Sequence, residues 1–248
     1  MFVPIADINP LEHVRRPYVT YALIAVNVLV YTLLQGGISG HPEEAGMVSF
    51  GAIPAVVSGL AVLPEGFLAP PADLTLVTYM FLHGSWLHLI GNMAFLWVFA
   101  DNVEDALGHL RFLLFYLLCG VAAAIAHVVV QPEAEGPLVG ASGAVAGVIA
   151  AYLVLHPNVR LWALVFMKVP LKVPAYLIIG VWLAVQIWQV VMAREGETAW
   201  VAHLGGFLAG GVLVLVMRRP GVALLDPDPS GVPSVRGEDK ARGDFRQR

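Results

Sequence analysis

Residues 199–217 read AWVAHLGGFLAGGVLVLVM, a run without Asp, Glu, Lys or Arg. A helix needs roughly 17 to 25 predominantly apolar residues to cross the hydrocarbon core of a bilayer, where no water is available to bond its backbone. Gly206 and Gly210 form a small-xxx-small face, which lets two helix backbones approach closely. The run therefore predicts a transmembrane helix that packs tightly against a neighbour and carries one ionisable side chain, His203.

Five other stretches have the same character, namely residues 18–34, 76–100, 112–130, 138–155 and 173–193. The chain of 248 residues is 58% hydrophobic and only 13% charged, which is far from the composition of soluble domains. Residues 48–71 are apolar but interrupted by Gly and Pro, and we expect an interfacial loop there. The predicted fold is all-α, a polytopic membrane protein with a six-transmembrane-helix bundle over residues 18–217. A cytoplasmic segment, residues 1–17, precedes it, and a disordered cytoplasmic tail, residues 218–248, follows.

Loop charges orient these spans, because Lys and Arg collect on the cytoplasmic side of a membrane. With the N-terminus inside, Arg194 is the one basic residue that falls in an outer loop, and a seventh span at 48–71 would break this sorting. The pattern predicts a multi-pass protein of the cell membrane, in contact with lipids, with both termini in the cytoplasm. The 14 Lys and Arg nearly balance the 18 Asp and Glu without clustering, which argues against a nucleic-acid partner.

Polar side chains inside a span are costly and are functional candidates by default. At about 1.5 Å per residue, His88, Asn92, Ser142 and His203 all lie roughly 5 to 10 Å below the outer boundary. His88 and Asn92 are four residues apart and share a helix face. We therefore expect three helices to converge on a polar pocket open to the outer side. Three other polar residues are read as interhelical hydrogen-bonding groups: Asn27, Gln186 and Gln189.

These residue types point to acyl transfer. A serine hydroxyl becomes a nucleophile when a base removes its proton, and neutral imidazole suits that task, so Ser142 pairs with His203. No carboxylate lies inside a predicted span to orient the histidine, which favours a Ser-His dyad over a triad. The Asn92 amide, a His88 nitrogen and the Ser142 backbone N–H are candidate donors to an oxyanion.

Each residue also has a structural interpretation. A lone serine can bond its own helix backbone, and a Gly-xxx-Gly face is usually helix packing, so the shared depth of the four groups carries the functional argument. His83 and His88 resemble metal ligands, but no Cys, Asp or Glu joins them within a span, and no metal site is predicted. A proton pathway through the histidines is an alternative, although the spans lack acidic residues and a two-fold repeat.

Three motifs occur in order: HGSWLHLIGNM at 83–93, GASG at 140–143, and AHLGG at 202–206 followed by Gly210. In these motifs, over roughly residues 17–217, the chain resembles the rhomboid intramembrane serine proteases. The resemblance implies that Ser142 attacks the peptide carbonyl, that His203 acts as base and then acid, and that His88 and Asn92 hold the oxyanion. It implies no metal, no cofactor, single-span transmembrane protein substrates and a movable cap at residues 194–198. Supporting roles are implied for His83, Gly140, Gly143 and Gly206.

Two positions depart from the family pattern. The first outer loop often carries a Trp-Arg pair, and here those positions hold Leu74 and Thr75. Many members place an aromatic residue four positions after the nucleophile, where it stacks on the catalytic histidine, and here that position is Ala146. Another side chain must therefore orient His203, or it is held more loosely. Some members of this fold are inactive and bind membrane clients without cutting them, a reading that the retention of Ser142 and His203 opposes.

Overall fold

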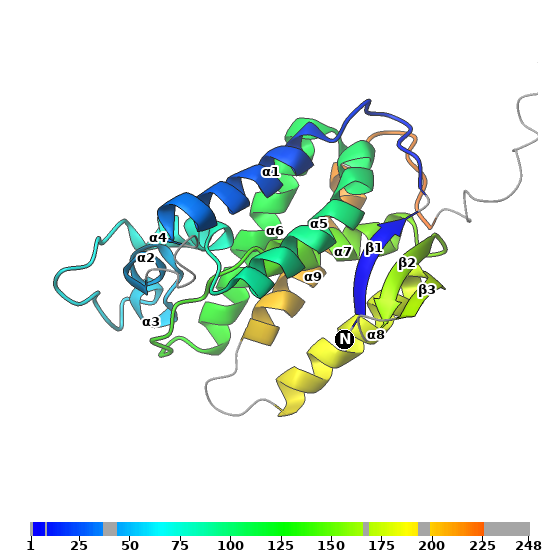
Figure 1. Ribbon diagram of the computed structural model, residues 1–248. Coiled ribbons are helices and arrows are strands. Elements are labelled where there is room, and N and C mark those ends of the chain that lie inside the picture. Colours follow the sequence, from blue (N-terminus) through cyan, green and yellow to red (C-terminus); the bar gives the residue numbers. More distant parts are fainter. Residues whose placement is uncertain (1, 8, 37–43, 166–168, 193–198, 226–248) are drawn as a thin grey trace, which may run out of the picture.

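The computed structural model describes residues 2–7, 9–36, 44–165, 169–192 and 199–225. It is mostly helical (Figure 1). Helix α1 (Tyr18–Leu29) continues into a π-helical turn (Val30–Leu34), and α5 (Trp86–Leu107), α6 (His109–Val130), α7 (Ser142–Leu155), α8 (Ala175–Met192) and α9 (Ala199–Met217) follow. Four short helical segments lie between α1 and α5: α2 (Glu44–Phe50), α3 (Pro54–Val57), α4 (Ala72–Thr78) and a 3-10 turn (Tyr79–Phe81).

Helix α7 is the centre of the molecule, with α5, α6 and α9 packed against it (Figure 1). Every residue from Gly143 to Tyr152 is buried. Small side chains make this possible, because a Cβ added at Gly206 of α9 would overlap the carbonyl oxygen of Gly143, and one at Gly210 would overlap the backbone of Gly147. The glycines therefore set a backbone-to-backbone contact between α7 and α9.

Two helices begin later than the sequence indicates. The stretch 76–100 divides into α4, the 3-10 turn and α5, because Ser85 starts a new helix: its Oγ accepts a hydrogen bond from the His88 backbone N–H at 3.1 Å. Likewise α7 begins at Ser142, whereas the predicted span began at residue 138. Leu138 instead pairs with Ala52 in an isolated antiparallel bridge. The interfacial region at 48–71 holds short helices and turns and no helix of membrane-spanning length within its described residues.

A three-stranded antiparallel sheet corrects the all-α prediction. Its strands are β1 (Phe2–Asp7), β2 (Arg160–Val165) and β3 (Val169–Pro174), in the order β1-β2-β3. In β2 the buried Leu161 and Ala163 alternate with the exposed Trp162, the period of two that a strand requires. The sheet was not predicted because it joins the N-terminal segment to a hairpin about 150 residues further on, and no local pattern reports that pairing.

Both ends of the described chain are tied to the helices. The Tyr152 hydroxyl of α7 donates a 2.8 Å hydrogen bond to Asp7 in β1, and burial raises the pKa of the Asp7 carboxyl to about 6. Beyond α9, the Arg219 N–H donates to Ala106 O and the Leu225 N–H donates to Val154 O. Residues 218–225 of the predicted tail thus contact the ends of α5 and α7, and residues 226–248 lie outside the described chain.

The surface is that of a membrane protein. Within the described chain, three helices are long and apolar enough to cross a membrane: His109–Val130, Ala175–Met192 and Trp200–Met217. Residues 18–34 and α7 are shorter apolar helices, and α5 has the length but carries His88, Asn92 and Asp101. Large apolar side chains stand exposed on the outward faces of α6, α8 and α9, among them Val129, Trp188, Leu208 and Val212.

Two carboxylates at the end of α5 hold the N-terminal segment. Glu104 is fully buried and accepts hydrogen bonds from the Val19 and Thr20 N–H groups, at 3.0 and 2.8 Å, and from the Thr20 hydroxyl. These are unpaired N–H groups of the first turn of α1, where a negative charge also meets the positive end of the helix dipole. His109 Nδ1 lies 2.5 Å from the same carboxylate.

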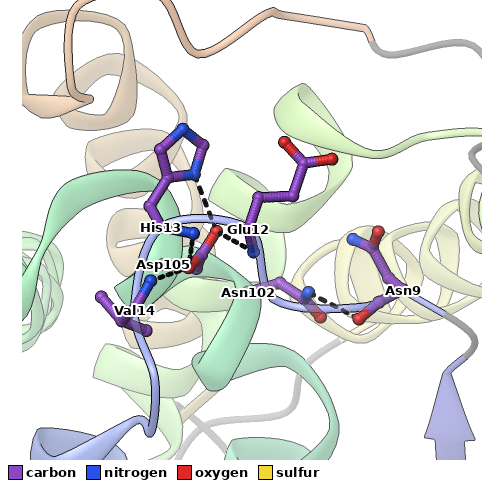
Figure 2. A network of polar contacts seen from close by, with 6 residues as sticks. All are labelled: Asn9, Glu12, His13, Val14, Asn102 and Asp105. Atoms are coloured by element: carbon purple, nitrogen blue, oxygen red, sulfur yellow. Dashed lines mark hydrogen bonds and ion pairs between the residues drawn. The ribbon is translucent and has the colours of Figure 1, made fainter. Parts of the chain in front are cut away.

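Asp105 binds the segment before α1 in the same way (Figure 2). Its carboxylate accepts hydrogen bonds from three successive N–H groups, those of Glu12, His13 and Val14, at 2.6 to 3.1 Å. The His13 ring adds a contact at 3.0 Å, and Asn102 Nδ2 donates to Asn9 O. Asn102, Glu104 and Asp105 of α5 therefore fix both the entry and the first turn of α1.

We expect Glu104→Ala to lower the free energy of unfolding by about 3 kcal/mol, because it leaves two helix N–H groups without their acceptor in a buried site. Glu12→Ala is the matched control, since Glu12 is exposed and contributes its backbone, which the change keeps. Thermal unfolding in detergent measures both. Equal melting temperatures for the two variants would contradict this account of the α1 cap.

Candidate active site

Ser142 is the first residue of α7, and a strained turn delivers it there. Gly140 has φ +118°, a backbone conformation that residues with a side chain rarely adopt. Its N–H donates a hydrogen bond to Tyr79 O at 2.9 Å. A Cβ at Gly140 would meet the His88 ring at 2.6 Å and lie 3.7 Å from Asn92 Nδ2. The turn thus brings the GASG motif against the face of α5 that carries His88 and Asn92.

His203, from α9, faces Ser142 across the glycine contact. Its Nε2 lies 2.8 Å from Ser142 Oγ, within hydrogen-bond distance, and both residues are half-buried. Its other ring nitrogen, Nδ1, lies 2.8 Å from Gln186 Oε1 of α8. The sequence predicts an interhelical hydrogen bond for Gln186, and the structure shows that its partner is His203.

Two tryptophans flank the imidazole. The Trp182 ring of α8 is centred 6.2 Å from the His203 ring, tilted by 36°, and the Trp200 ring of α9 is centred 5.7 Å away, edge-on at 78°. Ala146, where the family often has an aromatic residue, is fully buried between helices. Aromatic contact with the histidine therefore comes from α8 and α9 in this chain. Trp182 lies four residues before Gln186, a helical spacing visible in the sequence.

The residues of the HGSWLHLIGNM motif form a second polar group. His83 Nε2 lies 3.0 Å from Asn92 Nδ2, and the His83 and His88 rings are centred 5.1 Å apart. Gln35, for which the sequence predicts no role, holds the His83 backbone. Its Oε1 accepts a hydrogen bond from His83 N–H at 2.8 Å, and its Nε2 donates one to His83 O at 3.2 Å. In the sequence, the one indication of a role for Gln35 is that a polar residue directly follows the apolar run at 18–34.

A cavity of about 310 Å³ lies between α5, α7, α8 and α9, and most of its lining is apolar. Its polar lining consists of His88, Asn92, Ser142, Gln186 and His203. His83 lies behind Asn92, and Gly143 and Gly206 form the helix contact beneath. Across the described residues, no three His, Cys, Asp or Glu side chains gather as a metal site requires. The residues of the predicted cap, 194–198, lie outside the described chain.

The segment between α1 and α5 is anchored without the Trp-Arg pair. Thr78 Oγ1 donates to Phe50 O at 2.6 Å, which joins α4 to α2. Two backbone hydrogen bonds between Ala52 and Leu138 and one from Ala55 to Ala134 then join this loop to the segment before Ser142. Thr75, at one of the departing positions, is buried and bonds Ala72 O within α4.

The family model of the Rhomboid domain matches residues 72–220, which is more than half of the chain and includes all three motifs. The chain belongs to the rhomboid family. Members of this family are in general intramembrane serine proteases, although some relatives are inactive.

Curated relatives of this chain include rhomboid proteins of a plant and of yeast. Rhomboid-like protein 11, chloroplastic, of Arabidopsis thaliana is 31% identical over 170 residues, which are 64% of this chain and 57% of that protein. RHOMBOID-like protein 5 of the same plant is 28% identical over 193 residues, 77% of this chain and 59% of that protein. Rhomboid protein 1, mitochondrial, of Saccharomyces cerevisiae is 30% identical over 148 residues, 56% of this chain and 40% of that protein.

The chain thus spans less than two thirds of the length of these relatives. They support a membrane location. Two of their names specify chloroplasts and mitochondria, so the comparisons lend no support to the predicted cell membrane or to the predicted orientation of the termini.

We expect Gly140→Ala to lower the free energy of unfolding of this rhomboid by about 1 to 3 kcal/mol. Alanine is strained at the positive φ of this position, and its Cβ would overlap the His88 ring. Gly136→Ala is the matched control, since a Cβ there meets nothing within 4 Å. Chemical or thermal unfolding in the same detergent measures both variants. A Gly140→Ala protein as stable as Gly136→Ala would show that the turn does not need its glycine.

Proposed function

We propose that this chain is an intramembrane serine endopeptidase that cleaves single-span transmembrane proteins near the outer membrane face. Ser142 is the nucleophile and His203 the general base. The single observation that carries the proposal is the 2.8 Å separation of Ser142 Oγ and His203 Nε2, because a hydroxyl becomes nucleophilic when a base within hydrogen-bond reach takes its proton. Membership of the rhomboid family supports the same reaction.

The reaction follows from these positions. His203 Nε2 takes the Ser142 proton as Oγ adds to the scissile carbonyl carbon, and the resulting imidazolium returns that proton to the leaving amine. The acyl-enzyme remains on Ser142 until His203 deprotonates a water molecule that adds to the ester carbonyl. Ser142 Oγ then leaves and takes the proton from the His203 imidazolium, which releases the second product as a carboxylic acid and restores both residues. Each proton has a donor and an acceptor among these two residues, the substrate and water, so no cofactor or metal takes part in the proposed mechanism.

Donors for the oxyanion come from two helices. Ser142 is the first residue of α7, so its N–H has no carbonyl partner within the helix and lies at the positive end of the helix dipole. Asn92 and His88 of α5 lie beside Gly140, two residues from the nucleophile. Asn92 Nδ2 carries two hydrogens, one of which points to His83 Nε2, which leaves the other for a substrate oxygen.

We place the site below the outer surface of a six-span bundle over residues 18–217, in the cell membrane with both termini cytoplasmic. Helix α7 has 14 residues, about 21 Å at 1.5 Å per residue, which is shorter than the roughly 30 Å hydrocarbon core. A helix that reaches the inner boundary and is this short begins inside the membrane, which leaves room for water above Ser142. The distribution of Lys and Arg among the loops supports the orientation.

The direct test uses purified protein in detergent with a single-span reporter. We expect cleavage by the wild type, and a loss of at least about 10³-fold in Ser142→Ala and in His203→Ala, because each removes one half of the nucleophile pair. Ser58→Ala, in the outer loop away from the cavity, is the control for serine loss. A fluorophosphonate is expected to label the wild type at Ser142. Cleavage that persists in Ser142→Ala excludes the nucleophile, and a folded wild type that neither cleaves nor labels indicates an inactive relative.

Asn92→Ala is expected to lower kcat by about 10²- to 10³-fold with little change in KM, because the oxyanion forms only in the transition state. Fluorophosphonate labelling, which also builds negative charge on a phosphoryl oxygen, should slow in parallel. His88→Ala is expected to act in the same direction. A rise in KM at constant kcat would assign these residues to substrate binding instead.

A further inference from the structure

Gln186 is a polar side chain that a simple Ser-His dyad leaves without a role. It lies on α8, is 4% exposed, and places Oε1 at 2.8 Å from His203 Nδ1. The opposite ring nitrogen, Nε2, faces Ser142 Oγ, also at 2.8 Å. Gln186, His203 and Ser142 therefore form a continuous hydrogen-bonded row that joins α8, α9 and α7.

The amide oxygen of Gln186 determines which nitrogen of the His203 ring carries the proton. Neutral imidazole carries one proton, and a base for Ser142 must have Nε2 free to receive one, so the proton must reside on Nδ1. The Gln186 Oε1 atom only accepts hydrogen bonds, and its contact with Nδ1 therefore favours that tautomer. The same contact fixes the rotation of the ring.

We propose that Gln186 is a positioning residue that completes a Ser142-His203-Gln186 row, accepting the His203 Nδ1 proton and so holding the base in the reactive tautomer and orientation. The inference rests on the proposed protease function. Helix α8 also supplies the aromatic contact that position 146 lacks, because Trp182, one turn before Gln186, lies beside the His203 imidazole. Helix α8 thus supplies both the hydrogen-bond acceptor for His203 and an aromatic ring beside it.

A neutral amide suits this location better than a carboxylate. The cavity around His203 is mostly apolar, and burying an ionised group there would cost far more than burying an amide that has a partner. The amide also stabilises the imidazolium less than a carboxylate would, since it carries no net charge to oppose the positive ring. Replacing the amide by a carboxylate should therefore leave a signature in the pH dependence of the reaction.

Few other groups can produce that signature. The titratable side chain that shares the cavity lining with His203 is His88 of α5. His83 lies against His88, Tyr79 of the 3-10 turn and Cys119 of α6 lie against Gly143 and Gly147 of α7, and His127 is buried in α6. None of the described residues that line the cavity is a carboxylate. A change confined to Gln186 leaves all of these groups in place.

The experiment compares Gln186→Glu, Gln186→Met and the wild type by the rate of fluorophosphonate labelling at Ser142 and by reporter cleavage, each between pH 5 and pH 9. Gln186→Met keeps the side-chain length and removes the acceptor. Gln186→Glu keeps an acceptor and adds a negative charge. Gln189→Met is the matched control, a half-buried glutamine one turn further along the same helix.

We expect Gln186→Met to lower kcat and the labelling rate by roughly 10- to 100-fold, with KM within about two-fold of the wild type. The reason is that the His203 ring loses the hydrogen bond that fixes its orientation and tautomer. We expect Gln186→Glu to recover the wild-type rate at high pH, with the acid limb of its profile moved upward by about one to two pH units, because the carboxylate retains the proton on the imidazole. Gln189→Met should match the wild type in rate and in profile.

A purely structural tie between α8 and α9 would alter stability without moving the acid limb. An unshifted limb in Gln186→Glu overturns the inference, and so does a wild-type labelling rate in Gln186→Met. If Gln186→Met fails to fold, the profile of Gln186→Glu decides alone. A wild type that is neither labelled nor active refutes the proposed function itself, whereas active wild type with indifferent Gln186 variants refutes only the role of Gln186.

Discussion

The backbone contact between α7 and α9 is the constraint on which the site depends. Gly206 lies against the carbonyl of Gly143, and Gly210 lies against Gly147, so the two helices approach more closely than any side chain would allow. His203 lies one turn before Gly206 on α9, and Ser142 immediately precedes Gly143 on α7. The close approach therefore leaves His203 Nε2 2.8 Å from Ser142 Oγ. Hydrogen-bond geometry is lost within about half an ångström, which is why small residues are required beneath a reactive pair.

Neutral and charged polar groups are divided between two regions of the molecule. The cavity holds neutral side chains, an amide from α5, an amide from α8 and imidazoles, within an apolar lining. The carboxylates gather at the other end of α5, where Glu104 and Asp105 receive N–H groups from the N-terminal segment and from α1. Each buried charge is paired with several donors, which is the condition under which burial of a charge is tolerated. The same helix therefore carries the oxyanion candidates at one end and a structural clamp at the other.

Helix α8 has two faces of different character. Its outward side is strongly exposed, with Val185, Ile187, Trp188 and Val191 each 47% exposed or more, while its inward side presents Trp182 and Gln186 to His203. His203 is thus held from α9 by its own backbone and from α8 by the Gln186 side chain. The Gln186 contact therefore couples the orientation of the His203 ring to the position of α8.

The sequence by itself determined the membrane class, the run of apolar helices and the identity of the polar residues that meet, because burial in lipid forbids charge in a span and makes each retained polar group conspicuous. Only the tertiary structure decided that β1 pairs with β2, that Gln35 holds His83, and that Gln186 meets His203. Those contacts join residues 17 to about 160 positions apart, and their partners are chosen by the packing of whole elements, which local periodicity does not encode.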